Sequence, residues 1–143
     1  MRGTEIMHSP AVVCRSSATL WDVALLMRDR NVGSVIVLDE IGYLAGIVTD
    51  RDLAVRGLGE GRSAESHVDR VMTRDVATVD LHADVSEAAT IMAKRLVRRL
   101  PVVDALQHIY GVVTLDDLLR HLGSDADRLA DTVLMQSRHV TIP

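Results

Sequence analysis

Apolar side chains follow two patterns along this chain, and each pattern occurs twice. Continuous β-branched runs at Ser34–Leu38 and Leu100–Val103 are typical of strands that are covered on both faces. Ahead of each run, apolar residues recur every three or four positions, as expected for a helix with one buried face. Behind each run, a turn leads to a second apolar run and then to a short helix. The pattern therefore predicts two consecutive β-α-β-β-α units.

Both long helices are predicted to begin at a capping residue. Thr19 followed by Asp22 fits a capping box with aspartate in place of glutamate, and Asp84 with Glu87 forms the matching pair. The buried stripes of the two helices are expected to be Leu20, Val23, Ala24 and Met27 in the first, and Val85, Ala88, Ala89, Met92 and Leu96 in the second. The remaining strands are predicted at Ala11–Cys14, Ala45–Val48, Val76–Val79 and Tyr110–Val113, and the short helices at Asp50–Gly57 and Leu115–Leu122.

The two units are copies of one sequence. A shift of 65 residues lays Ile6–Leu53 over Val71–Leu118 without a gap, and 13 of the 48 aligned positions are identical. Two copies are too few for a solenoid, so they predict a pseudo-twofold pair of α/β repeats with a cleft between equivalent surfaces. We place the first repeat at residues 5–60, the second at 70–123 and a C-terminal helical tail at 124–143.

The tail has no counterpart in the first repeat. Residues 125–136 fit a helix whose apolar side chains include Leu129, Val133 and Leu134. A lone exposed helix would not keep such a surface. We therefore expect the tail to pack on its own module or on a partner chain, and to serve assembly rather than ligand binding.

Composition excludes several classes of protein. The net charge of −4 and the aromatic content of 2% argue against a nucleic-acid surface, and the apolar runs are too short to span a membrane. Cys14 is the single cysteine, which excludes an internal disulfide, and no signal-peptide pattern opens the chain. A cytoplasmic protein is the resulting expectation. The six histidines lack close zinc-ligand spacing, so no metal is predicted.

A Thr-x-x-Asp element follows the last strand of each repeat, as Thr49/Asp52 and Thr114/Asp117. Its spacing fits a helix capping box, in which the side chains satisfy free backbone N–H groups. The same corner suits a ligand, because an Asp at this place can accept hydrogen bonds from two ribose hydroxyls. Capping and ligand binding are compatible, so both interpretations stand.

Adjacent cations distinguish the second repeat from the first. Arg98 and Arg99 precede its buried strand, whereas Gly33 and Ser34 hold those positions in the first repeat. Arginine offers a bidentate fork for phosphate. The alternative is that the two side chains merely solvate an exposed turn.

These marks resemble the cystathionine-β-synthase-type (CBS) domain pair, or Bateman module. They are Ile6-Met7 and Val71-Met72 at the repeat starts, the Leu-Pro-Val-Val-Asp104 strand and the doubled Gly-x-x-Thr-x-x-Asp element. The run from Thr49 to Leu58 is similar to small bacterial stand-alone CBS-pair proteins of the hypoxic-response type.

The resemblance implies that an adenosine-containing ligand, such as AMP, ADP, ATP or S-adenosylmethionine, binds in the cleft between the repeats. Carried over by position, one site comprises Thr49, Asp52, Val76, Ala77 and Thr78, with Arg98 and Arg99 near the phosphate. The pseudo-symmetric site comprises Thr114, Asp117, Ala11, Val12 and Val13, and it has Gly33 and Ser34 where phosphate contacts are needed.

The sequence therefore favours a non-catalytic regulatory module that requires no cofactor. We expect a homodimer that signals to an unknown effector protein through altered dimer geometry or partner binding. The alternative is a ligand-free CBS dimerisation scaffold. An enzyme is disfavoured, because no Ser/His/Asp triad or paired carboxylates stand out.

Overall fold

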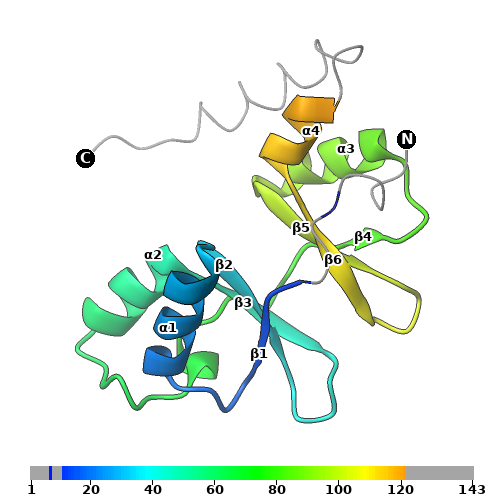
Figure 1. Ribbon diagram of the computed structural model, residues 1–143. Coiled ribbons are helices and arrows are strands. Elements are labelled where there is room, and N and C mark those ends of the chain that lie inside the picture. Colours follow the sequence, from blue (N-terminus) through cyan, green and yellow to red (C-terminus); the bar gives the residue numbers. More distant parts are fainter. Residues whose placement is uncertain (1–6, 8–10, 122–143) are drawn as a thin grey trace. The chain divides into compact units, whose positions relative to one another are not determined.

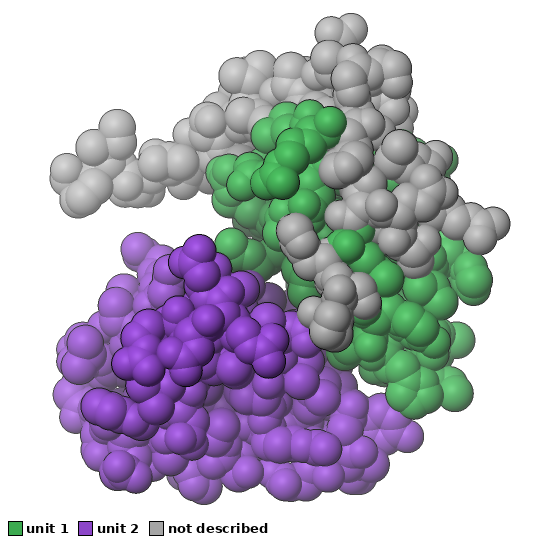
Figure 2. Space-filling model, viewed as in Figure 1, with its two compact units in different colours: residues 1–10, 77–143 green, residues 11–76 purple. Residues whose placement is uncertain are grey.

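The computed structural model describes residue 7 and residues 11–121, apart from the side chain of residue 121. It divides into two compact units (Figure 2). The repeat-one unit is Ala11–Val76, and the repeat-two unit combines Met1–Pro10 with Ala77–Pro143. The predicted tail lies outside the described residues, so its helix and its role in assembly stay predictions.

The repeat-one unit is a three-stranded sheet with its helices on one side (Figure 1). Strand β2 is central, with β1 parallel to it on one edge and β3 antiparallel to it on the other. The elements are β1 Val13–Arg15, α1 Leu20–Arg30, β2 Ser34–Leu38, β3 Leu44–Thr49, α2 Asp50–Asp52, the π-helix η2 Leu53–Leu58 and the 3₁₀ helix η3 Val68–Arg70. Leu20, Val23 and Met27 of α1 close the core over the sheet.

The repeat-two unit has the same layout, with β5 between β4 and β6 (Figure 1). Its elements are β4 Val79–Asp80, α3 Val85–Arg95, β5 Arg99–Val103, β6 Ile109–Thr114 and α4 Leu115–His121. Strand β4 is parallel to β5 and β6 is antiparallel to it, with a register shift late in β5 as in β2. The predicted α/β fold of tandem β-α-β-β-α repeats is confirmed.

The leading methionine of each repeat belongs to the core of the other unit. Met7 packs against the repeat-two core, whereas Val71 and Met72, both buried, belong to the repeat-one core. Thr73 holds the neighbouring Met72 in the repeat-one unit, because the N–H and C=O of Thr73 pair with the C=O and N–H of Ile47 in β3. The compact units therefore begin and end elsewhere than the sequence repeats do.

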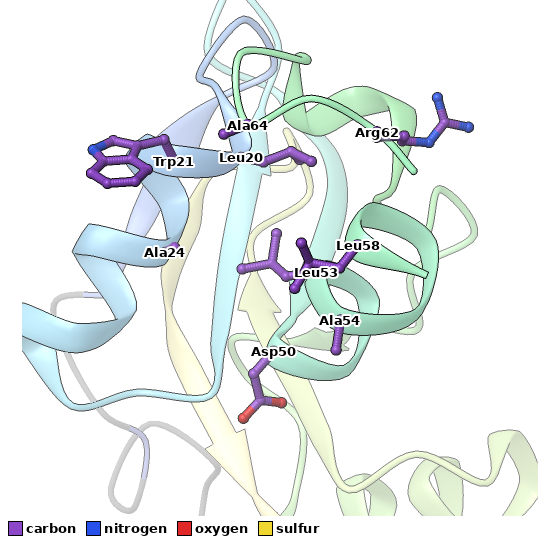
Figure 3. A pocket seen from close by; sticks show the side chains of 9 residues that line it. All are labelled: Leu20, Trp21, Ala24, Asp50, Leu53, Ala54, Leu58, Arg62 and Ala64. Carbon is purple, nitrogen blue, oxygen red and sulfur yellow. The ribbon is translucent and has the colours of Figure 1, made fainter. Parts of the chain in front are cut away.

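Two residues of the predicted helical stripes were assigned wrongly. Ala24 is exposed, because the buried side of α1 is already filled by Leu20, Val23 and Met27. Leu96 lies beyond the end of α3 with a left-handed φ of 56°, and its side chain is 44% exposed. The small Ala24 side chain leaves room for the surface pocket of Figure 3.

The first strand of each repeat lies further along the chain than predicted. Strand β1 begins at Val13 rather than Ala11, and β4 begins at Val79 rather than Val76. Residues 76–78 are therefore extended chain ahead of the sheet and not part of its hydrogen-bonded ladder. Helix α2 also differs, because after three residues it continues as a π-helix from Leu53 to Leu58.

Candidate functional site

The Thr49 corner of the repeat-one unit is a reciprocal capping box. The Asp52 N–H donates to the Thr49 hydroxyl at 3.1 Å, and the Thr49 N–H donates to Asp52 Oδ2 at 2.9 Å. Aspartate therefore fills the glutamate position of the motif, as the spacing predicted. The geometry holds the carboxylate at the strand-to-helix turn through Oδ2, and Oδ1 lies 4.0 Å from Arg56 Nε. The Asp52 side chain keeps 15% of its surface exposed.

Thr114 and Asp117 reproduce this corner in the repeat-two unit. The same two hydrogen bonds measure 2.9 and 3.1 Å. Asp117 is only 2% exposed, however, and it is the buried charged residue of the described part of the chain. The two corners thus share the same capping hydrogen bonds and differ in solvent exposure, because Asp52 is the more exposed of the two carboxylates.

The cationic pair of the second repeat lies beside its own Thr114. Arg99 and Thr114 are cross-strand partners, and the Leu115 N–H donates to the Arg98 carbonyl at 2.7 Å. Arg98, Arg99 and Thr114 line a pocket of about 210 Å³ together with Leu115, Asp116 and Arg120. Three arginines and one aspartate give the lining a net positive charge, which suits an anion.

Arg120 was missed by the sequence analysis. It follows Asp116 by one turn of α4, and so it lies on the same side of the helix as that pocket residue. The signal was the i, i+4 spacing from Asp116, which lies two residues after Thr114. That spacing becomes informative only once the helix is known to continue to residue 120.

The equivalent corner of the first repeat has the opposite character. Asp50 follows Thr49, and a Cβ on Gly33 would lie 3.3 Å from Asp50 Oδ2. The position equivalent to Arg98 therefore has a carboxylate close to it in the first repeat. The inequality of the two phosphate positions stays a prediction.

The chain segments named for the predicted sites are half-buried or buried, except at Val13. Ala77 is 7% exposed, Val76 and Thr78 are half-buried, and Val13 is 40% exposed. Val12 is anchored to β2, because its carbonyl accepts the Ile36 N–H at 3.0 Å. Each unit is described by itself, so the predicted grouping of Asp52 with residues 77–78 and Arg98 stays a prediction.

Other reactive groups have structural explanations. Burial, followed by the nearby negative charge of Asp22, raises the pKa of the Cys14 thiol to about 11, so thiolate is scarce at neutral pH. Hydrogen bonds from the His108 backbone and side chain, and from Leu106 and Tyr110, lower the pKa of Asp104 to about 2. Asp104 closes the β5–β6 turn, as Asp39 does for β2–β3.

No group of three His, Cys, Asp or Glu residues in the described part of the chain is placed to hold a metal ion. In the same part, no helix is long and apolar enough to cross a membrane.

A protein-family comparison matches the CBS domain model twice, over residues 4–58 and 68–124. Among curated relatives, MK0525 from Methanopyrus kandleri is 31% identical over 117 residues, which are 81% of this chain and 60% of that protein. Hypoxic response protein 1 from Mycobacterium tuberculosis is 30% identical over 123 residues, which are 85% of each chain.

Two solved structures are similar to this chain. The crystal structure of Hypoxic Response Protein I, which has two coordinated zinc ions, superimposes with a TM-score of 0.77 at 28% identity. The superposition spans 85% of this chain and 99% of the Hypoxic Response Protein I chain. The CBS domain pair of protein MJ0100, in complex with 5′-methylthioadenosine and S-adenosyl-L-methionine, also gives a TM-score of 0.77 at 28% identity. This superposition spans 86% of this chain and 96% of the MJ0100 chain.

Proposed function

The chain belongs to the CBS domain family, and from that membership we propose that it is a non-catalytic regulatory module that binds an adenosine-containing ligand. The Thr49/Asp52 corner is the observation that carries the proposal. Its capping box engages Asp52 Oδ2, and we propose Oδ1 as the acceptor for ribose hydroxyls. MJ0100, whose CBS pair is bound to two adenosyl compounds, supports the ligand class.

The ligand contacts that we propose come from both units. For the first site we propose the residues that the family resemblance implies, which are Thr49, Asp52, Val76, Ala77 and Thr78, with Arg98 and Arg99 near the phosphate. The second Thr/Asp corner, with Ala11, Val12 and Val13, is proposed as the weaker site. Asp117 at that corner is nearly fully buried, and Asp50 stands where a phosphate would need a cation.

Thermal denaturation with and without AMP, ATP, S-adenosylmethionine and 5′-methylthioadenosine tests the proposal. A ligand that binds the folded protein raises its melting temperature. At a ligand concentration of about a hundred times Kd, the added free energy of unfolding is about 2.7 kcal/mol. A protein whose melting temperature is unchanged by all four, and which shows no heat in calorimetric titration, is not an adenosyl-ligand module.

The arginine pocket should discriminate between phosphorylated and neutral ligands. We expect Arg98→Gln with Arg99→Gln to lower the affinity for AMP about tenfold or more and that for adenosine little, because only AMP offers a charged partner. The exposed Arg30→Gln serves as a control for a lost surface charge. Titration calorimetry at two salt concentrations measures both effects. An equal loss for AMP and adenosine would contradict phosphate recognition.

Regulation requires the ligand to favour one state of the protein over another. We propose that this state is expressed in the geometry of a homodimer or in the binding of an effector protein. We propose that the output is binding and not chemistry, because the chain matches the CBS domain family over both repeats.

A ligand-free dimerisation scaffold is the second candidate function, and an apolar pocket of about 480 Å³ favours it. Figure 3 shows the pocket between α1 and the π-helix, with Leu20, Leu53 and Leu58 lining it and Trp21 at its rim. Trp21 is 59% exposed and Leu58 is 82% exposed.

We propose a second copy of the chain as the occupant of this surface. Asp50 and Arg62 lie at opposite ends of the pocket (Figure 3). A twofold axis through the pocket would bring each acidic end against the basic end of the other copy.

We expect Trp21→Ser to shift the protein toward the monomer, because an exposed tryptophan is a typical anchor of an interface. Light scattering across a concentration series measures the shift. Tyr43→Ser, which removes another exposed aromatic side chain on the β2–β3 hairpin, is the control. A Trp21→Ser protein with the wild-type mass at every concentration would exclude this surface as the dimer contact.

A further inference from the structure

A single arginine links the proposed ribose acceptor to the chain that leads out of the repeat-one unit. Arg56 Nη1 donates to the carbonyl oxygens of Val71 at 3.2 Å and Met72 at 3.3 Å. Its Nε lies 4.0 Å from Asp52 Oδ1, one helical turn earlier. Arg56 is therefore in contact with both the carboxylate and the segment that precedes Val76.

These contacts complete a closed path inside the unit. Thr73 follows Met72 and is paired with Ile47, which lies two residues before Thr49 in β3. Thr49 in turn holds Asp52 through the capping box. The carboxylate, the strand that carries it and residues 71–73 are thus joined in a ring, and Arg56 supplies its long-range side-chain link.

The link depends on the π-helix. Arg56 is the fourth residue of the π-helix Leu53–Leu58, and its own carbonyl accepts from Arg62 Nε at 3.1 Å. A π-helical turn changes the direction of the side chains that follow it, and such turns frequently occur at functional sites. In the second repeat the corresponding residue is His121, at the end of a regular α-helix. The arrangement therefore belongs to the more accessible of the two Thr/Asp corners.

The simplest role of Arg56 is structural, since it provides donors to carbonyl groups of the buried residues Val71 and Met72. That role does not account for its approach to Asp52. At 4.0 Å the Nε–Oδ1 separation exceeds a hydrogen bond, so the cation can orient the carboxylate electrostatically and still leave Oδ1 to another donor.

Resting on the proposed function, we propose that Arg56 is a positioning residue that holds Asp52 Oδ1 in place for a vicinal diol and so sets the preference for ribose over deoxyribose. The guanidinium does this from two sides. It attracts Oδ1, and it ties the π-helix η2 to residues 71–72. The ligand class selected is a nucleotide with both ribose hydroxyls.

The test compares AMP with 2′-deoxy-AMP by titration calorimetry on the full chain. We expect the wild type to prefer AMP about tenfold, as for one hydrogen bond to a charged acceptor. Arg56→Gln should weaken AMP binding about tenfold and 2′-deoxy-AMP binding less than threefold, which nearly removes the preference. Arg56→Lys keeps the positive charge and should restore part of it.

Arg51→Gln is the matched control, because Arg51 is an exposed arginine of the same helical segment and should leave both affinities unchanged. Melting curves of all variants show whether each is folded at the titration temperature. Hydrogen exchange at the Met72 and Thr73 amides adds a ligand-free readout, and it should be faster in Arg56→Gln.

Three results would overturn the inference. Arg56→Gln could weaken both nucleotides equally, which would leave only the structural role. It could keep the wild-type preference, or the Met72 and Thr73 amides could exchange at the wild-type rate. A wild type that binds neither nucleotide would instead overturn the proposed function, and the inference with it. The two failures are therefore distinguishable.

Discussion

Replacing Asp52 by alanine is expected to abolish most adenosyl-ligand binding and to leave the fold intact. The carboxylate is the proposed acceptor for ribose hydroxyls, and hydrogen bonds to a charged group contribute about 1.5–3 kcal/mol each. Losing them should lower the affinity for AMP by about tenfold to a hundredfold. The loss of the cap itself should cost only about 0.5–2 kcal/mol of folding stability. Calorimetric titration and a melting curve of the same preparation measure the two effects.

The chain provides a matched control for this change. Asp22 forms the same reciprocal box with Thr19 at the start of α1, with hydrogen bonds of 3.0 and 3.1 Å. Asp22→Ala removes a capping carboxylate without touching the proposed site, so it should lower stability and spare binding. If Asp52→Ala and Asp22→Ala behave alike in both measurements, Asp52 is only a cap.

The capping contribution of Asp22 also predicts a pH dependence. Hydrogen bonds from the Thr19 backbone and side chain lower the pKa of Asp22. A carboxylate whose pKa is lower in the folded than in the unfolded state stabilises the fold above its unfolded pKa. That contribution is lost as the pH falls through its folded pKa. The stability difference between Asp22→Ala and wild type should accordingly shrink in acid.

The sequence was sufficient to predict the elements because their signals are local. The β-branched run at Ser34–Leu38 forms β2 with the predicted bounds, and the Thr49/Asp52 spacing forms a capping box in the structure. Both depend on residues within one or two turns of each other. Because the repeats align with a shift of 65 residues, each element predicted in one repeat could also be predicted in the other.

The exchange of Met7 and Met72 could not be read from the same signals. Periodicity shows that a methionine faces a core, but it does not show which of two similar cores receives it. That choice is made by contacts distant in sequence, such as the Thr73–Ile47 pair. The π-helix after Asp52 was not predicted either, and its Gly57 lies close to Leu20 of α1, which is distant in sequence.

Ala24 and Arg120 illustrate a further limit. Alanine is compatible with either face of a helix, so the stripe of α1 did not decide its exposure. Arg120 joins the anion pocket only because α4 turns its side chain back toward Arg98 and Arg99. Sites built from exposed, charged residues need the geometry, whereas cores can be predicted from hydrophobicity.

Replacing Gly46 by alanine is expected to destabilise the repeat-one unit. A Cβ at this position would lie 2.7 Å from both Met72 Sδ and the Thr73 carbonyl oxygen. The methionine can adjust, but the carbonyl is held by its hydrogen bond to the Ile47 N–H at 3.0 Å. Gly46→Ala should therefore push residues 72–73 away from β3 and destabilise the protein by about 1–3 kcal/mol.

Gly33→Ala is the control that separates this close approach from a general effect of adding a methyl group. Its nearest neighbour is Asp50 Oδ2 at 3.3 Å, the end of an exposed and flexible side chain, so the stability should change little. Denaturant unfolding of both variants gives the two free energies.

The displacement of residues 72–73 in Gly46→Ala should also change ligand binding. The carbonyl groups of residues 71–72 accept hydrogen bonds from Arg56 Nη1. Moving these residues away from β3 would therefore remove the support that we propose for Asp52. Gly46→Ala should then reduce the preference for AMP over 2′-deoxy-AMP at a temperature where the variant is fully folded. A Gly46→Ala protein as stable as the wild type would mean that the 72–73 segment is not held against β3 as described.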